Sequence, residues 1–445
     1  MEVPEWRAGV ARVTITPPVG IAMIGFAGRA SSNDVQDDLT ATALVVEGPG
    51  SGGAPGRAAI IACDLLWLEE PAVARVRAAV AALTDVAGDH VLIACSHTHY
   101  GPMVDAGSEL AGPQVGPYVD NLVHLLAGAV AMAESRLTPC RFGFGEGEAR
   151  IGINRRERLA DGRMILGQNP DGPYDPRVAL LRIDDAEGRP LALLLNHACH
   201  PVSLGGTCTH ISADFPGHAR RLIEAETGTT ILFLQGSTAD VNPLLMGWDW
   251  SHPTRLGTTL GEEAIRIYKG ITPAPASGFV GMARAEVDLP PLLPPSVEEG
   301  EALVASLTAE LERVREAGAP GPIWWAGGRL DRARHGLEAL RGGPGVEPVP
   351  ASLAALRIGQ IALATSPGEI FTRLGGAVVD GSPFAHTMFA GYTDGSIGYV
   401  PTRDAYPEGG YEVTHACRVA PEAGELVVST AGRLLGDLHN HLVDG

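Results

Sequence analysis

VLIACSHTHYGP, residues 91–102, passes from an unbroken apolar run into two histidines and then a Gly-Pro pair. The apolar run is typical of a buried strand, and the Gly-Pro pair marks the end of a regular element. His97 and His99 therefore lie where a strand becomes a loop, and an extended backbone points both side chains the same way. Open α/β sheets bind ligands at strand ends, and neutral imidazole is the commonest metal ligand. The segment thus indicates a metal site, although an isolated motif of this kind is more often two polar loop residues.

Apolar patterns on both sides of this segment predict an α/β fold with mixed sheets flanked by helices. Strands are predicted at 8–16, 39–47, 58–64, 140–147, 178–183, 191–195, 230–234 and 361–365. Helices are predicted at 71–86, 118–137, 215–227, 254–268, 297–318 and 329–340. Residues 154–175 have a polar pattern that predicts a loop, and 178–195 an antiparallel strand pair. We expect one catalytic domain over 1–445 with a helical insertion at 289–350.

Composition narrows the classes of protein that the chain can be. Apolar residues make up 45% of the 445 residues and charged residues 19%, as in soluble globular proteins. The net charge of −19 argues against nucleic acid or an anionic membrane as the main partner. The six cysteines are scattered without a CxxC motif, and the N-terminus does not have the pattern of a secretion signal. No uninterrupted apolar run reaches the length that spans a bilayer. We expect a cytoplasmic protein without disulfides.

Two further residues complete the set that a catalytic metal site needs, which is typically three protein ligands and an open position. His200 ends the apolar run before Pro201, and Glu369 follows the predicted strand at 361–365. Alone, Glu369 after Pro-Gly would be a helix N-terminal residue stabilised by the helix dipole. Asp64, at the end of another predicted strand, either orients a ligand or caps the strand.

Several motifs occur in an order that resembles the neutral/alkaline (non-lysosomal) ceramidase family. They are ITPPVGIAMIGFAG (15–28), SHTHYGPM (96–103), GINRR (152–156), NHACHPVSLG (196–205), ISADFPGHA (211–219), QGSTADVNP (235–243), SPGE (366–369) and GYTDGSIGYVPTRDAYPEGGYE (391–412). Each motif is weak alone, but so many in one order are hard to produce by chance. The resemblance implies a ceramidase catalytic-domain fold and a zinc amidase, which in that family releases a fatty acid and sphingosine from ceramide.

Carried over by position, the resemblance implies a role for eight residues. The implied zinc ligands are His97, His200, Glu369 and Tyr399. The implied catalytic residues are His99, Arg155, Tyr411 and Asn242. His99 would be a neighbour of the metal that moves the proton to the leaving amine, and Arg155 and Tyr411 would contact the substrate or its oxyanion. Zinc would supply the nucleophile by acidifying a bound water.

One departure from the family concerns the nucleophile. The family carries serine in a Gly-Asp-Val-Ser-Pro-Asn segment, whereas this chain reads Ala239-Asp240-Val241-Asn242-Pro243-Leu244. An amide nitrogen does not attack a carbonyl. Either zinc-bound water is the nucleophile and Asn242 orients the substrate, or the chain has become a ceramidase-fold binding protein. We favour the first, because the metal set is complete without the serine.

The sequence says least about the substrate. The resemblance implies a role in sphingolipid metabolism. The chain, however, ends without room for the C-terminal β-sandwich of the family, so a smaller soluble amide is as good an expectation as a lipid. Another metal-dependent amidohydrolase remains an alternative, although eight regular βα units are not visible. Sites with two histidines and a carboxylate accept several metals, and a homo-oligomer is possible.

Overall fold

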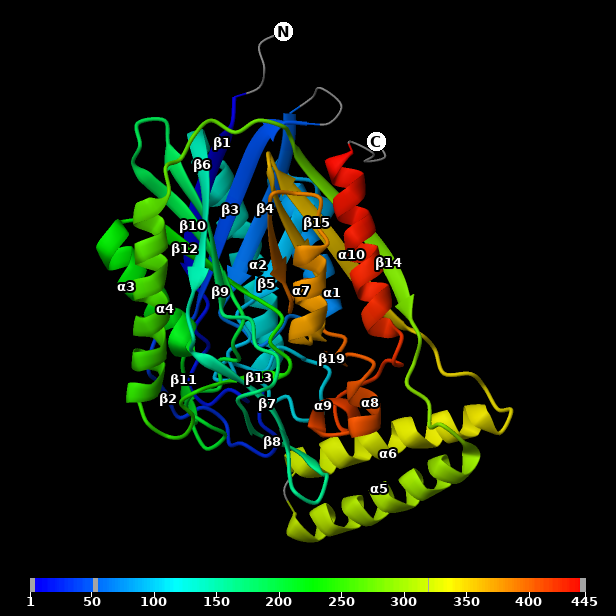
Figure 1. Ribbon diagram of the computed structural model, residues 1–445. Coiled ribbons are helices and arrows are strands. Elements are labelled where there is room, and N and C mark those ends of the chain that lie inside the picture. The colour runs from blue at the N-terminus through cyan, green and yellow to red at the C-terminus, as the bar shows by residue number, and fades with distance from the viewer. Residues whose placement is uncertain (1–4, 51–54, 319, 441–445) are drawn as a thin grey trace.

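Two large sheets form the centre of the protein, whose computed structural model describes residues 5–50, 55–318 and 320–440 (Figure 1). The order of strands in the eight-stranded sheet is β12 (Thr230–Gln235), β10 (Pro190–His197), β9 (Arg177–Asp185), β6 (Thr138–Glu148), β1 (Arg7–Thr14), β3 (Thr40–Pro49), β4 (Pro55–Cys63) and β5 (Val91–Cys95). The order in the four-stranded sheet is β14 (Val280–Leu289), β15 (Val349–Ile358), β16 (Ile361–Thr365) and β18 (His386–Ala390).

Most strands of the eight-stranded sheet are buried on both faces, which explains their continuous apolar sequences, whereas β6 is largely half-buried or exposed. One face packs against the four-stranded sheet, and the other carries helices: Ile60 points to the sheet side and Ile61 to the helix side. The helices on the eight-stranded sheet are α1 (Glu70–Leu83), α2 (Val115–Glu134), α3 (Asp214–Thr227) and α4 (Ser251–Gly270). The helices on the outer face of the four-stranded sheet are α7 (Thr372–Asp380) and α10 (Ala423–His439). The predicted class, mixed α/β with flanking helices, is confirmed.

The eight-stranded sheet curls, and this brings its two ends together. Strands β1 and β6 pair only at Arg7 and Ala8, and β12 at one edge lies close to β4 and β5 at the other. In the two large sheets, three pairs of neighbouring strands run parallel: β4 with β5, β10 with β12, and β16 with β18. The Asn196 side-chain amide ties two of these pairs by donating to Leu234 O (2.9 Å) and Phe389 O (3.0 Å). The carboxyl ends of the three pairs therefore meet in one place.

Short elements surround that place. A three-stranded sheet contains β13 (Val241–Pro243), β7 (Gly152–Arg158) and β8 (Met164–Asn169). Two-residue ladders join β17 (Glu369–Ile370) to β19 (Tyr399–Val400) and β2 (Asp34–Val35) to β11 (His210–Ile211). Short helices are η1 (Gly88–His90), α8 (Ala405–Glu408) and α9 (Tyr411–Thr414).

The loop predicted at 154–175 is wrong, because β7 and β8 form a hairpin there. The strands turn at Gly162, which has φ 87° and donates its N–H to Leu159 O (2.9 Å). Strand β8 is half-buried or exposed along its length. It therefore lacks the apolar alternation by which strands are recognised in sequence.

Helices α5 (Val297–Ala317) and α6 (Pro320–Leu340) form a hairpin between β14 and β15, at the base of Figure 1. The prediction that the second helix begins at 329 is wrong, since α6 includes Trp324 and Trp325. The glycines at 327 and 328 weakened the helical pattern. The hairpin has a core of its own, separate from the main cores: Leu307, Leu311, Ala326, Leu330 and Ala333.

Helix α2 meets the length and composition of a membrane-crossing helix, although Asp120 and His124 interrupt its apolar sequence. Half of its most apolar window, 50%, is buried against the rest of the protein, as in a core helix. It packs on β1, β3 and α1. The six cysteines are free and buried.

Candidate metal centre

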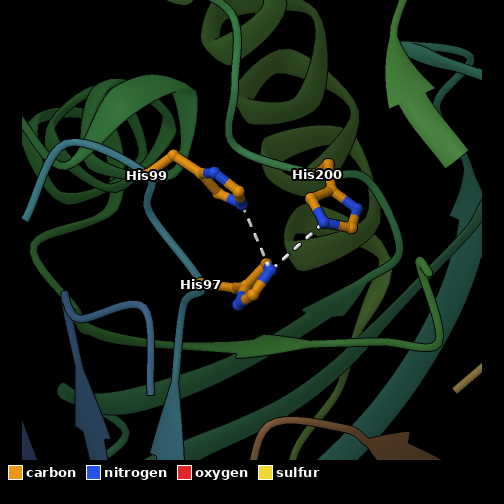
Figure 2. A group of neighbouring side chains, drawn as sticks. All are labelled: His97, His99 and His200. Atoms are coloured by element: carbon orange, nitrogen blue, oxygen red, sulfur yellow. Dashed lines mark hydrogen bonds between the residues drawn. The ribbon is translucent and has the colours of Figure 1, made fainter. Parts of the chain in front are cut away.

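The three histidines come from loops that follow parallel strands (Figure 2). His97 follows β5 and has φ 66°, a conformation that non-glycine residues rarely adopt. Its backbone N–H donates to Leu65 O (2.8 Å), and that of His99 donates to Pro201 O (3.2 Å). The strained conformation at His97 is therefore held by backbone bonds that also fix the direction of its ring.

Each imidazole has one nitrogen committed to a backbone carbonyl. The Nδ1 atoms of His97, His99 and His200 lie 2.9 Å from Leu66 O, 3.0 Å from Gly25 O and 2.7 Å from Thr238 O, respectively. A carbonyl only accepts hydrogen bonds, so each Nδ1 carries the proton and each Nε2 presents a lone pair.

These lone pairs converge with a carboxylate. His97 Nε2 lies 3.1 Å from His200 Nε2 and 3.3 Å from His99 Nε2. Glu369 Oε2 lies 3.4 Å from Nε2 of both His97 and His200, and is buried without a hydrogen-bond partner in the described part of the chain. Acceptors that face one another repel unless a cation lies between them. The donor set therefore fits a metal ion.

The pKa values of these groups favour the forms that bind metal. Burial, together with the nearby charge of Arg155, lowers the pKa of His200 to about 4. Burial also holds the pKa of His99 well below its usual value, with the charges of His97 and His200 adding to the effect. Burial alone would raise the pKa of Glu369, but His97 and His200, in their protonated forms, outweigh burial and hold it well below its usual value. Neutral imidazoles and an ionised carboxylate are metal ligands.

The other predicted residues, which are Tyr399, Asn242 and Tyr411, all contact Arg155, which lies next to this cluster. Its guanidinium is buried and donates to the Tyr399 hydroxyl (2.9 Å) and to Asn242 Oδ1 (3.3 Å). The backbone of Tyr399 pairs with that of Glu369 in the β17–β19 ladder. The Tyr411 ring lies 5.8 Å from the Tyr399 ring, with Arg155 Cζ 5.9 Å from its centroid. The structure thus brings the eight predicted residues into one connected group.

The sequence did not identify two residues that belong to this group. Glu412 is buried and accepts hydrogen bonds from Arg155 Nε (2.8 Å) and Arg156 Nη1 (2.8 Å). The Tyr392 ring stacks on His97 at 3.9 Å, and its buried hydroxyl has no partner among the described residues. Two adjacent arginines in a buried strand require a carboxylate, but sequence alone does not say which one.

Asp64 does not contact the histidines. Its carboxylate pairs with Arg220 (2.8 Å) and accepts the backbone N–H of Thr40 (2.8 Å), so it fixes the ends of β3 and β4. The structure therefore favours the strand cap among the two roles expected of it.

The structure is a mixed α/β protein whose fold matches that of neutral ceramidase. The chain is homologous to the neutral ceramidase of Pseudomonas aeruginosa, with 23% identity over 92% of this chain and 68% of that protein. Neutral ceramidase A of Dictyostelium discoideum is 29% identical over 36% of this chain and 24% of its own. The crystal structure of the Pseudomonas enzyme matches with a TM-score of 0.75 at 20% identity, over 100% of this chain and 76% of that one. A ceramidase complexed with C2 matches with a TM-score of 0.74 at 20% identity, over 99% and 76%. No family model matches the chain.

Proposed function

We propose that the protein is a metal-dependent hydrolase that cleaves the N-acyl bond of a linear amide. The observation that carries the proposal is the convergence of three imidazole lone pairs and the partnerless Glu369 oxygen at one point. The likeness to neutral ceramidase supports amide hydrolysis as the reaction. We propose a cytoplasmic location and a small-molecule or lipid amide as substrate.

Zinc is the metal that we propose, with His97, His200 and Glu369 as ligands. Two imidazoles and a carboxylate are a donor set of catalytic zinc sites, which leave room for further ligands. The Tyr399 hydroxyl is the proposed fourth protein ligand. Burial raises the pKa of Tyr399 well above its usual value, and the charge of Arg155 and its hydrogen bond from Nη2 (2.9 Å) offset this in part by favouring the ionised form. When bound, the metal would acidify water and polarise the amide carbonyl.

The remaining residues of the site would stabilise negative charge on the substrate and transfer protons. Arg155 is the cation of the site, and Asn242 Oδ1 and Glu412 hold its guanidinium in a fixed orientation. Arg155 and the Tyr411 hydroxyl would stabilise the negative charge that develops on the carbonyl oxygen. His99 can accept a proton at Nε2, because its Nδ1 proton is held by Gly25 O (3.0 Å), and can deliver it to the leaving nitrogen.

Metal analysis together with an amide screen tests this proposal. Elemental mass spectrometry of the purified protein should find about one zinc per chain, and the metal should be lost from His200→Ala. Turnover of a library of N-acyl amides should stop with chelator and in Glu369→Ala. A protein that binds no metal after incubation with zinc would refute the metal site. Metal without turnover of any amide would instead favour a ceramidase-fold binding protein.

A further inference from the structure

Helix α6 extends along one side of the site. Near its start, Gly321 lies so close to Gly28 that an added Cβ would stand 2.3 Å from Gly28 N. The loop before Gly28 holds His99 through Gly25 O. Farther along, Arg332 Nη2 donates to His415 O (3.2 Å), next to α9, which lies above α6 in Figure 1. The helix therefore connects the segment that holds His99 with the segment that carries Tyr411.

Three arginines gather where α6 meets the segment after α9: Arg329, Arg332 and Arg418, here called the arginine group. Arg329 is 8% exposed and donates to Glu310 (2.7 Å), yet its buried Nε has no partner in the described part of the chain. Arg332 and Arg418 are exposed. Partial burial of its guanidinium lowers the pKa of Arg332, and the charges of Arg418 and Arg329 lower it further. Among the described residues, Glu310 is the one carboxylate within ion-pair distance of any of the three.

The arginine group borders the candidate site on two sides. The Tyr411 ring stacks on the His415 ring at 5.5 Å, and Arg332 bonds to the carbonyl of that same His415. On the other side lies Glu69, whose pKa is raised by burial and lowered only in part by the charge of Arg418, and whose carboxylate accepts from Trp67 Nε1 (2.6 Å). The Trp67 ring in turn lies 6.3 Å from that of His97.

Part of this arrangement is structural. The Arg329–Glu310 ion pair joins the two helices of the hairpin, and Arg332 neutralises a carbonyl at the end of α9. Each guanidinium offers five N–H donors, however, and these contacts use one donor each. The chain as a whole carries a net charge of −19, so a local excess of positive charge beside the site is unusual. The structural contacts of these arginines do not account for that excess.

We propose that the arginine group binds a carboxylate on the amine part of the substrate, so that the preferred substrates are N-acyl amino acids. This inference rests on the proposed amide hydrolysis. In that reaction the C–N bond breaks, the acyl carbon gains the hydroxyl of water and the nitrogen gains its proton, releasing a fatty acid and an amino acid. A guanidinium fork matches a carboxylate bidentately, whereas a neutral amino alcohol would leave the arginines without a counter-charge.

The test compares an N-acylglycine with the N-acylethanolamine that has the same acyl chain. The two amides differ only in that the first carries a carboxylate where the second carries a CH₂OH group. The wild type should favour the acylglycine about tenfold or more in kcat/KM, and Arg332→Gln should reduce this preference about tenfold, chiefly through KM. Arg334→Gln is the matched control: Arg334 is exposed like Arg332 and lies on the same helix, but it pairs with Asp331 instead of adjoining His415, so the variant should keep the preference.

A second arm separates recognition from catalysis. The affinities of the two amides for Glu369→Ala protein should show the same preference, and 0.5 M salt should weaken it. Equal use of both amides by the wild type, or a preference unchanged in Arg332→Gln, would overturn the carboxylate subsite and leave the hydrolase proposal standing. Preferential binding of the acylglycine without hydrolysis by the wild type would support the subsite and overturn the hydrolase.

Discussion

His99 lies at the edge of the proposed ligand set. Glu369 Oε2 is equally far, 3.4 Å, from His97 Nε2 and His200 Nε2, so these three groups enclose one point. His99 Nε2 approaches the set from the His97 side, at 3.3 Å. A residue in this place is close enough to exchange a proton with a substrate at the metal without having to be a ligand.

His99→Ala should therefore keep the metal and lose activity. Removal of a general acid–base group reduces kcat by about 10²-fold or more. His200→Ala should lose the metal itself. Elemental mass spectrometry and kcat, measured on the same preparations, separate these outcomes. Metal-free His99→Ala protein would make His99 a ligand instead.

Asp214 is a second residue whose surroundings lead to a measurable effect. Burial raises its pKa to about 6, against 3.8 ordinarily, although Ser203 N (2.9 Å) and Phe215 N (2.6 Å) donate to it. The folded state thus binds this proton more tightly than the unfolded state. The stabilisation is complete below about pH 4 and is lost as the pH rises through about 6.

Asp214→Asn removes this titration. The free energy of unfolding of the variant, relative to wild type, should rise by about 2–3 kcal/mol between pH 4 and pH 7. Urea denaturation at several pH values measures the difference in free energy of unfolding between variant and wild type. Replacing the carboxylate also has a cost that does not depend on pH, so only the change of this difference with pH is compared. A difference that is flat with pH would show that Asp214 is not buried as described.

At the scale of elements, the sequence predicts helices and strands whose buried faces are apolar. It misses elements whose side chains face solvent or whose pattern is interrupted by glycine. Strands β4 and β10 are apolar on both faces and were located closely. Strand β8 was missed because its side chains face solvent, and the start of α6 because two glycines interrupt it. Helix and strand patterns arise from burial, so an element without a buried face gives a weak signal.

The contact between β1 and α2 permits a prediction about packing. A Cβ on Gly9 would stand 2.1 Å from Ala133 O, a backbone atom at the end of α2. Gly9→Ala should lower the free energy of unfolding by about 2 kcal/mol or more, because the helix must shift. Gly128→Ala, inside the same helix with nothing within 4 Å, should raise it by about 0.5–1 kcal/mol. Chemical denaturation of both variants provides the comparison, and similar values for the two would contradict such close packing.

At the scale of the whole molecule, the site depends on distances that the sequence does not contain. His97 and His200 lie on loops after β5 and β10, and Glu369 begins β17 shortly after β16. The curl of the eight-stranded sheet and its packing against the four-stranded sheet bring the three together. Composition and periodicity predicted that each of these residues lies at or just after the end of a strand. They did not predict that these strand ends lie next to one another in space. The order of motifs, through the resemblance, supplied the grouping. Glu412 and Tyr392 lie within the last of these motifs, but the resemblance assigned neither of them a role.

A metal at this junction would connect segments far apart in the chain and should stabilise the whole fold. At a free zinc concentration about 1,000 times Kd, the stabilisation is about 4 kcal/mol. Addition of chelator should lower the midpoint of thermal unfolding of the wild type and leave that of His97→Ala unchanged. Equal effects of chelator on both proteins would place the bound metal elsewhere.

The separate core of the α5–α6 hairpin has a consequence for how such a protein can change over time. A unit that buries its own apolar residues can acquire new side chains, or be replaced as a cassette, without repacking the sheets that hold the histidines. Its inner side lies beside the site and, apart from close contacts such as Gly321 on Gly28, its sequence is under little constraint from the main cores. Descendants of one chain could therefore keep one chemistry and exchange the hairpin to accept new substrates.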